Sequence, residues 1–233
     1  LRTDQRFNMS GYAALKLEKV RIGHIGQGGR GAGVVQQLPK IEGTEIRALC
    51  DLIPERSELA AARLKKMGTF EPTLYTGTEE AWKKVCERDD IDLVYTSTPW
   101  KLHTPIAVYA MNHGKHAVAE VPAALTIDEC WQLVEASEKN RKHFMMAQNT
   151  CYDFFEMLTL NMARQGFFGD IIHGEGAYLH TFTFDPNQKE HRVWRVLENA
   201  ARNGNLYPTH GIGPVCQAMN INCGDRLDFL VSV

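Results

Sequence analysis

The sequence predicts an α/β protein with a doubly wound parallel sheet, followed by a second and smaller domain. From residue 20 to residue 148, short apolar runs alternate with helix-like segments of about 10–15 residues, a pattern typical of parallel strands joined by helices. After residue 149 the alternation ends, and helix-like and aromatic-rich segments follow. We therefore expect one domain over residues 1–148, with an N-terminal tail or strap at 1–18, and another over 149–233.

Composition narrows the class of protein. The 233 residues suffice for a substantial core, and 44% hydrophobic with 23% charged residues is ordinary for a globular protein. The formal net charge of -2 gives no electrostatic reason to expect a nucleic-acid or anionic-membrane partner. No apolar run approaches the roughly 20 residues that a membrane span needs.

Cysteine and histidine spacing predicts no metal site. The 6 cysteines are scattered without CxxC pairs, so neither a zinc site nor a disulfide framework is indicated. The histidines lack the spacing of metal ligands. The first residues contain no apolar signal region, so the compartment stays open between export followed by signal removal and the cytoplasm.

The first expected strand leads into a glycine-rich turn. An apolar run over 20–25 is followed by Gly26-x-Gly28-x-x-Gly31 and then by a helix-like segment over 34–38. Strand, glycine turn and helix in this order suit a dinucleotide. The glycines allow a tight turn and close approach of the pyrophosphate, and the helix N-terminus attracts the anion. By itself the motif is also compatible with a purely structural turn.

The second expected strand makes the nucleotide interpretation more specific. The run over 45–50 ends at Asp51, twenty residues after Gly31. A carboxylate at this position accepts hydrogen bonds from the adenosine ribose, which favours NAD over NADP. The sequence therefore predicts an NAD-binding domain.

The remaining elements of the first domain continue the alternation. Pro54 suits the first turn of a helix and Gly68 its end, while Thr126 and Glu129 have the spacing of a capping box. We expect helices over 54–67, 79–88, 103–112 and 126–140, and strands over 74–75, 91–99, 117–119 and 143–147.

Ligands of a doubly wound sheet bind beyond the carboxyl ends of its strands. This rule groups five strand ends into one rim. The cofactor-binding candidates on it are Gln27, Gly28, Gly29, Arg30, Asp51, Trp100, Lys101, Leu102, His103, Glu120, Val121 and Asn149. Trp100 would stack on the cofactor, and Glu120 would accept hydrogen bonds from ribose hydroxyls or the carboxamide. His103 would contact the nicotinamide ribose or the reacting centre, or else serve only in the first turn of its helix.

The second domain has a different pattern. We expect an amphipathic helix over 152–165, then an aromatic-rich strand over 171–184 with Tyr178 and His180 on one face, because side chains alternate along a strand. A loop over 203–211 leads into a helix that ends near residue 220. The last segment, 227–233, is expected to be a strand with an exposed apolar edge, which predicts pairing with a second copy or poor solubility.

Four motifs carry a resemblance to a known family. They are Glu120-Val121-Pro122, Gln148-Asn149-x-Cys151-Tyr152, Gly176-x-Tyr178-x-His180 and the run from Arg202 to Gly211. From about Val20 onward, the chain resembles the glucose–fructose oxidoreductase, inositol dehydrogenase and MocA family. Within that family it is most similar to glycoside hydrolase family 109, the NAD-dependent α-N-acetylgalactosaminidases. The resemblance implies a bacterial type of enzyme with a Rossmann domain and an α+β substrate domain built on an open antiparallel sheet.

Two departures from the family pattern are evident. The middle residue of the Glu-x-Pro triplet is commonly a lysine that assists alcohol oxidation, whereas this chain has Val121, which disfavours simple dehydrogenase chemistry. Family members also continue for many more residues. The resemblance therefore implies a second domain with an incomplete sheet, in a fragment or in a shortened protein.

The resemblance also implies a redox route to glycoside hydrolysis in which NAD is not consumed. Hydride leaves sugar C3, the ketone acidifies the C2 proton, a base removes that proton, the C1 leaving group departs, water adds and the ketone is reduced again. The sequence offers no persuasive carboxylate pair of the kind that ordinary glycosidases use. The protein then has to position the sugar and move protons.

Three side chains are the catalytic candidates that the resemblance implies: His210, Tyr207 and Tyr178. His210 would take the proton of the C3 hydroxyl, since imidazole exchanges protons near neutral pH, or else be a helix-start histidine held by the backbone. Tyr207 would bind the same sugar or pack within its loop, and Tyr178 would act as C2 base or orienting group. Arg195 would hold an acetamido carbonyl or a cofactor phosphate, or stay solvated. The substrate-binding candidates are Tyr178, Arg195, Tyr207, Pro208, Thr209 and His210.

The sequence leaves three functions open. The leading one is NAD-dependent hydrolysis of a small molecule or glycan that ends in α-N-acetylgalactosamine. The second is a net NAD-dependent sugar or polyol dehydrogenase, which would accumulate NADH. The third is an NAD-binding module without catalysis.

Overall fold

The computed structural model describes residues 5, 7–179, 193–202 and 205–231. The chain divides into two compact units, Leu1–Ala147 and Gln148–Val233. The segment before the first strand, expected to be a tail or a strap over the first domain, contacts that domain through two of its described residues. Gln5 donates a 3.0 Å hydrogen bond to Glu138, and Tyr12 packs against His143 with ring centroids 5.3 Å apart.

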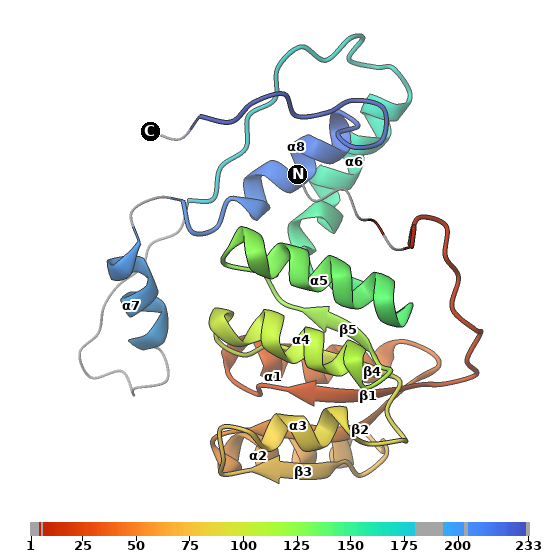
Figure 1. Ribbon diagram of the computed structural model, residues 1–233, viewed down its shortest axis with the longest axis vertical. Coiled ribbons are helices and arrows are strands. Elements are labelled where there is room, and N and C mark those ends of the chain that lie inside the picture. The colour runs from red at the N-terminus through yellow and green to blue at the C-terminus, as the bar shows by residue number, and fades with distance from the viewer. Residues whose placement is uncertain (1–4, 6, 180–192, 203–204, 232–233) are drawn as a thin grey trace. The chain divides into compact units, whose positions relative to one another are not determined.

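The first unit contains one parallel sheet, as the alternating pattern predicted (Figure 1). Its strand order, β3-β2-β1-β4-β5-β6, is that of a Rossmann fold, and every neighbouring pair is parallel. The α/β class is therefore confirmed. The strands are β1 (Val20–Ile25), β2 (Thr44–Asp51), β3 (Thr73–Thr76), β4 (Leu93–Thr96), β5 (His116–Ala119) and β6 (Phe144–Met146).

Helices cover both faces of this sheet (Figure 1). The helices are α1 (Gly29–Gln37), α2 (Pro54–Lys66), α3 (Ala81–Cys86), α4 (His103–Asn112) and α5 (Ile127–Asn140), with the short 3-10 helices η1 (Leu38–Lys40) and η2 (Trp100–Leu102). One buried cluster joins the sheet to α3, α4 and α5, and a second joins it to α1 and α2. Both faces bury apolar side chains, so the parallel strands are covered on each side.

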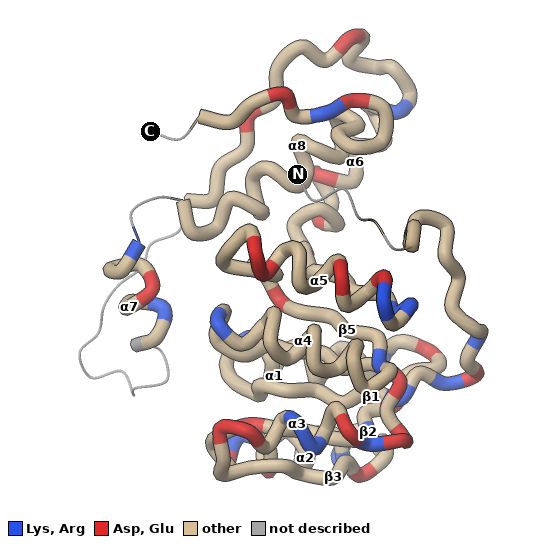
Figure 2. Tube along the Cα trace, in the orientation of Figure 1, with Lys and Arg blue, Asp and Glu red and all other residues tan. Residues whose placement is uncertain are grey.

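Local chemistry fixes the ends of these helices. Pro54 opens α2, where a missing N–H costs nothing, and the Thr126 side chain accepts from the Glu129 N–H in a complete capping box at α5. Asp128 and Glu129 lie in the first turn of α5 and Lys139 in its last turn, which suits the helix dipole, and Figure 2 shows further charged residues along this helix. Helix α1 begins at Gly29, earlier than expected, because its glycine-rich first turn carries no apolar periodicity.

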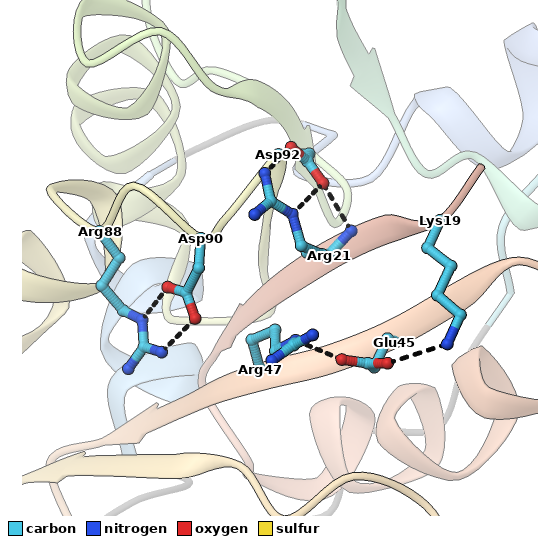
Figure 3. Close-up of polar contacts among 7 residues, drawn as sticks. All are labelled: Lys19, Arg21, Glu45, Arg47, Arg88, Asp90 and Asp92. Atoms are coloured by element: carbon cyan, nitrogen blue, oxygen red, sulfur yellow. Dashed lines mark hydrogen bonds and ion pairs between the residues drawn. The ribbon is translucent and has the colours of Figure 1, made fainter. Parts of the chain in front are cut away.

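Ion pairs gather where the strands begin (Figure 3). The Arg21 guanidinium binds both oxygens of Asp92, at 2.8 Å and 2.6 Å, and lowers the pKa of that carboxyl. Glu45 pairs with Arg47 and, over 3.4 Å, with Lys19. These contacts lie at the amino ends of β1, β2 and β4, away from the edge where the glycine turn is found.

The second unit is helical in its described residues. It contains η3 (Asn149–Tyr152), α6 (Phe154–Arg164), α7 (Val193–Ala201) and α8 (Thr209–Ala218). The strand expected over 171–184 is wrong for its described part, since 171–179 has no regular structure, and 180–184 lies outside the described residues. The expected strand over 227–233 is likewise not formed in 227–231.

A strand needs a neighbouring strand to satisfy its backbone hydrogen bonds, and among the described residues of this unit no strand is present to pair with either segment. The antiparallel sheet implied by the family resemblance is therefore not formed in this part of the chain. A search of the described residues also found no helix that is long and apolar enough to cross a membrane.

Candidate active site and cofactor site

The glycine turn between β1 and α1 has the shape that a pyrophosphate requires. Gly26 has φ of +90°, a conformation that side chains disfavour. A side-chain atom on Gly31 would overlap the carbonyl oxygen of Gly26, so this position requires glycine. At Gly28 an added Cβ would meet only Arg56, at 3.7 Å, so the backbone at the start of α1 is open to a ligand. These residues fit a dinucleotide bound at a helix N-terminus.

Asp51 anchors the same turn from the end of β2. Its Oδ2 accepts the Gln27 backbone N–H over 2.6 Å, and its Oδ1 accepts the Ile53 N–H over 2.9 Å. Arg56 lies 3.6 Å from Oδ1. A carboxylate has about four acceptor positions, so capacity remains for a ribose hydroxyl.

The side chain of Gln27 connects the glycine turn to residues of β1 and α2. Its amide Nε2 donates to the His24 carbonyl oxygen and contacts His24 Nδ1 at 2.9 Å and 2.8 Å, and Ser57 donates to its Oε1. His24 is 0% exposed, and burial lowers the pKa of its imidazole to about 3. Gln27 therefore has both its side chain and its backbone N–H engaged with the protein, and its main contribution is to hold the shape of the turn.

Glu120 is held by two partners. The Tyr95 hydroxyl donates to its Oε1 over 2.8 Å, and Arg30 Nε donates to the same oxygen over 3.0 Å. Burial, followed by the nearby Glu120 charge, raises the pKa of Tyr95. Sequence reasoning missed Tyr95. The signal that was available is its position in β4, where it alternates with the buried Val94 and Thr96.

His103 is placed differently from the expected cofactor contact. The residue is 1% exposed, and its Nδ1 and Nε2 lie 2.7 Å and 2.9 Å from the carbonyl oxygens of Pro122 and Thr98. Burial lowers the pKa of this imidazole, although the backbone contacts oppose the shift. Both ring nitrogens thus face the backbone, which favours a role in holding the two loops that surround Glu120.

The other candidates near η2 vary in exposure. Trp100 and Val121 are buried, Lys101 is exposed, and Leu102 packs against the core cluster under α4. Asn149 begins η3 and belongs to the second unit. The first unit therefore brings together the glycine turn, Asp51 and Glu120 at the carboxyl ends of its strands.

The second unit brings the three catalytic candidates into one stacked group. The Tyr207 and His210 rings lie 5.0 Å apart at 28°, and the Tyr178 ring lies 5.1 Å from Tyr207 and 5.0 Å from His210. The Arg195 guanidinium lies over Tyr207, 4.7 Å from its ring centre. The positions of these four residues in the sequence do not by themselves imply this grouping. They come from the 171–179 segment, from α7, from the loop before α8 and from α8 itself.

Two glycines allow the 171–179 segment to lie directly against α8. A Cβ on Gly176 would overlap the backbone of Gly211, and one on Gly211 would overlap Gly176. A Cβ on Gly174 would lie 2.7 Å from the side chain of Val215. Two residues that are two positions apart in an extended chain are separated by about 6.6 Å. This matches the separation of about 6.0 Å between residues four positions apart along a helix. Tyr178 consequently lies beside Tyr207 and His210.

His210 is held from η3. Its Nδ1 lies 2.8 Å from Gln148 Oε1 and 3.3 Å from Thr150 Oγ1. Sequence reasoning used Gln148 only as part of a family motif and missed Thr150, because these residues lie 62 and 60 positions from His210. Pro208 precedes α8 and Thr209 is its first residue. His180, on the expected face of Tyr178, lies outside the described residues.

An imidazole beside two phenols, one of them under a guanidinium, can move protons and bind a polar, hydroxyl-rich ligand. A search of the described residues found no group of three or more metal-ligating side chains. The arrangement therefore supports proton transfer at an organic substrate in the second unit and dinucleotide binding in the first.

Family comparisons match each unit separately. The family described as "Oxidoreductase family, NAD-binding Rossmann fold" matches residues 20–148, and "Glycosyl hydrolase 109, C-terminal domain" matches residues 152–233. Among solved structures, the chain is similar to an aldose-aldose oxidoreductase from Caulobacter crescentus, with a TM-score of 0.67, 22% identity, and coverage of 87% of this chain and 58% of that one. This likeness shows the fold.

Curated relatives are closer in sequence. Glycosyl hydrolase family 109 protein 1 of Bacteroides thetaiotaomicron is 53% identical over 94% of this chain and 46% of its own length. The corresponding Porphyromonas gingivalis protein is 52% identical with the same coverage. A Bacteroides fragilis alpha-N-acetylgalactosaminidase is 47% identical over 100% of this chain and 56% of its own length. The chain thus spans about half the length of the curated relatives that it matches.

Proposed function

Because the chain belongs to the glucose–fructose oxidoreductase, inositol dehydrogenase and MocA family, and within it to glycosyl hydrolase family 109, we propose that it is an NAD-dependent glycosidase that releases terminal α-N-acetylgalactosamine. The observation that carries the proposal is the stacked group of Tyr178, Tyr207 and His210, with His210 Nδ1 held by Gln148. The identity to a Bacteroides fragilis protein with the name of this activity supports the choice of sugar.

The residues for NAD are those of the glycine turn and the two carboxylates. Gly28 and Gly29 would receive the pyrophosphate, Asp51 the adenosine ribose, and Glu120 a hydroxyl of the second ribose or the carboxamide. When bound, the nicotinamide would supply an acceptor for the C3 hydride of the sugar and later return that hydride. Arg30 would turn from Glu120 toward the phosphates, which is a modest movement for a side chain that is 56% exposed.

We assign the proton-transfer steps to side chains of the second unit. His210 would take the proton from the C3 hydroxyl and give it back when the ketone is reduced. Tyr178 would orient C2, or in its deprotonated form would take the C2 proton, which the loss of hydride from C3 makes more acidic. The Tyr207 hydroxyl would bind the sugar between them, and the Tyr207 ring would keep the imidazole plane in place.

Recognition of the acetamido group falls to the polar side chains around the same cluster. Arg195 lies over Tyr207 and has donors for an amide oxygen. Thr209 Oγ1 is buried without a hydrogen-bond partner in the described part of the chain, so a substrate amide or hydroxyl would satisfy it. Pro208 would fix the backbone between Tyr207 and Thr209.

Assembly is a second part of the proposal. Leu227, Phe229, Leu230 and Val231 are each at least 63% exposed. Contiguous apolar side chains of this kind stabilise contacts between chains. We propose that this segment, 227–231, pairs with the same segment of a second copy.

The decisive experiment is incubation of this chain with a chromogenic α-N-acetylgalactosaminide, with and without added NAD, and in parallel with His210→Ala. We expect sugar release that depends on NAD and shows no lasting rise in NADH absorbance. The variant should lose about 10²- to 10⁴-fold in rate, the usual contribution of a general acid–base group.

Other outcomes identify the other functions. Accumulation of NADH in step with turnover would indicate a net sugar or polyol dehydrogenase. NAD binding without turnover of any α-glycoside would indicate a binding module. Hydrolysis at the same rate in His210→Ala would remove His210 from the mechanism.

A further inference from the structure

Gln148 lies against the candidate base of the second unit. The residue is 8% exposed, and its amide oxygen Oε1 lies 2.8 Å from His210 Nδ1. The Thr150 hydroxyl donates to the same oxygen over 2.9 Å. Gln148 immediately precedes η3, and His210 lies in the first turn of α8, so the contact joins two elements of the unit.

We propose that Gln148 is a positioning residue that fixes the tautomer of His210. An amide oxygen only accepts hydrogen bonds, so the Nδ1 atom that faces it carries the hydrogen. In a neutral imidazole, the other ring nitrogen then holds the lone pair. The atom that takes a proton from the sugar is therefore Nε2. This proposal depends on the proposed function only for the identity of the group that gives the proton to Nε2.

The tyrosines do not supply this information. Tyr207 and Tyr178 pack against the His210 ring with centroids 5.0 Å away, which restrains the plane of the imidazole. Stacking does not distinguish Nδ1 from Nε2, because a ring rotated by half a turn about its Cβ–Cγ bond keeps the same plane and the same stacking contacts. A directional hydrogen bond at one nitrogen does distinguish them. Gln148 therefore adds a restraint that the aromatic group lacks.

A neutral partner suits a base that has to return its proton. A carboxylate in this position would stabilise the imidazolium and hold the proton more firmly. The amide orients the ring without adding negative charge. Among the described residues, Tyr178 and Tyr207 contact this ring, and Arg195 lies over Tyr207.

The first test needs no substrate. The full chain is labelled with ¹⁵N-histidine, and the His210 signals are identified as those lost in His210→Phe. We expect the wild type to have hydrogen on Nδ1 and none on Nε2. The opposite orientation of the Gln148 amide would place its amino group against Nδ1 and reverse the tautomer. A signal pattern with hydrogen on Nε2 in the wild type therefore overturns the proposal.

Two variants extend the test. Gln148→Met removes the acceptor while keeping an unbranched side chain, and Gln148→Glu keeps an acceptor and adds charge. We expect Gln148→Met to lose the preference for Nδ1–H and Gln148→Glu to keep it. With substrate, Gln148→Met should lose about 10- to 100-fold in kcat with little change in KM. Gln148→Glu should move the acidic limb of the kcat/KM profile to higher pH.

The matched control is Gln217→Met, which makes the same chemical change at a position on α8 and should leave both tautomer and kinetics unchanged. If Gln148→Met does not fold, the wild-type and Gln148→Glu spectra still decide the question. An unchanged pH profile in an active Gln148→Glu would count against the proposal. The Nδ1–H tautomer in a chain without glycosidase activity would instead count against the proposed function alone.

Discussion

His24 lies beneath the glycine turn with its ring nitrogens directed at Gln27 and Ser97. Burial lowers its pKa from 6.5 to about 3, so the folded protein keeps this ring neutral while the unfolded chain takes up a proton below about pH 6.5. The contribution of His24 to the free energy of unfolding is therefore fully present above that pH and is lost as the pH decreases toward 3. His103, whose pKa burial also lowers, acts in the same direction.

The expected loss from His24 between about pH 7 and about pH 5 is about 2 kcal/mol of unfolding free energy. Urea unfolding at a series of pH values measures it. His24→Gln should flatten the slope, whatever its effect on stability at neutral pH. An equal slope in that variant, or a His24 ring that protonates above pH 5 in the folded wild type, would contradict this account.

We expect Asp51 to set the choice between NAD and NADP. In Asp51→Ser the carboxylate is lost, and Arg56, which lies 3.6 Å from it, becomes available to a 2′-phosphate. We expect the ratio of NAD to NADP affinity to fall about 10- to 100-fold, the equivalent of one or two charge-assisted hydrogen bonds. Calorimetric titration with each dinucleotide measures the ratio.

Asp51→Asn is the control for the structural role of this side chain, since it keeps one acceptor for the Gln27 or Ile53 backbone while removing the charge. Adding Arg56→Gln to Asp51→Ser should abolish the gain for NADP. An Asp51→Ser protein with an unchanged preference would show that the adenosine ribose lies elsewhere.

Among residues, the sequence predicted those whose role depends on a local pattern. The glycines and Asp51 belong to a fixed spacing, and the structure places them at one edge of the sheet. The contacts of Tyr95 with Glu120 and of Gln148 with His210 were missed because the partners lie 25 and 62 positions apart. Spacing in a single sequence does not contain such contacts.

At the scale of elements, α1 offers a matched pair of glycines. Gly31 lies against the Gly26 carbonyl, whereas an added Cβ on Gly33 would have nothing within 4 Å. Gly33→Ala should stabilise the protein by up to about 1 kcal/mol, because alanine favours helix. Gly31→Ala should destabilise it by about 1–3 kcal/mol and abolish NAD binding, because the turn has to open.

Thermal unfolding and a dinucleotide titration of both variants measure these effects. Each changes one hydrogen to a methyl group in the same helix, so helix propensity cancels in the comparison. NAD binding by Gly31→Ala at wild-type affinity would mean that the close contact of helix and turn is not required.

The first unit was predictable element by element because strands there end at glycine, proline or polar residues and are separated by periodic helices. The second unit was not. The pattern over 171–179 is that of a strand, but a strand depends on its neighbour, and the glycines at 174 and 176 instead bring this segment against α8. Its composition suits both arrangements.

At the scale of the whole molecule, the proposed pairing through 227–231 has a direct test. Light scattering during size-exclusion chromatography, over a range of concentrations, should show a dimer or larger species. Phe229→Lys should shift the protein toward monomer, since it places a charge in the proposed contact. Leu15→Lys, at another site that is 92% exposed, should not. A soluble wild-type monomer at all concentrations would refute the pairing.

The ion pairs of Arg21, Asp92 and Glu45 lie apart from the candidate ligand groups of the first unit, which has a practical consequence for protein engineering. Arg21, Asp92 and Glu45 lie where the strands begin, whereas Gly28 and Asp51 lie at the opposite ends of β1 and β2. Substitutions that adjust heat tolerance at the first set need not disturb coenzyme affinity at the second. A library of variants restricted to the amino-end positions should therefore yield proteins with higher thermal stability and an unchanged preference for the dinucleotide.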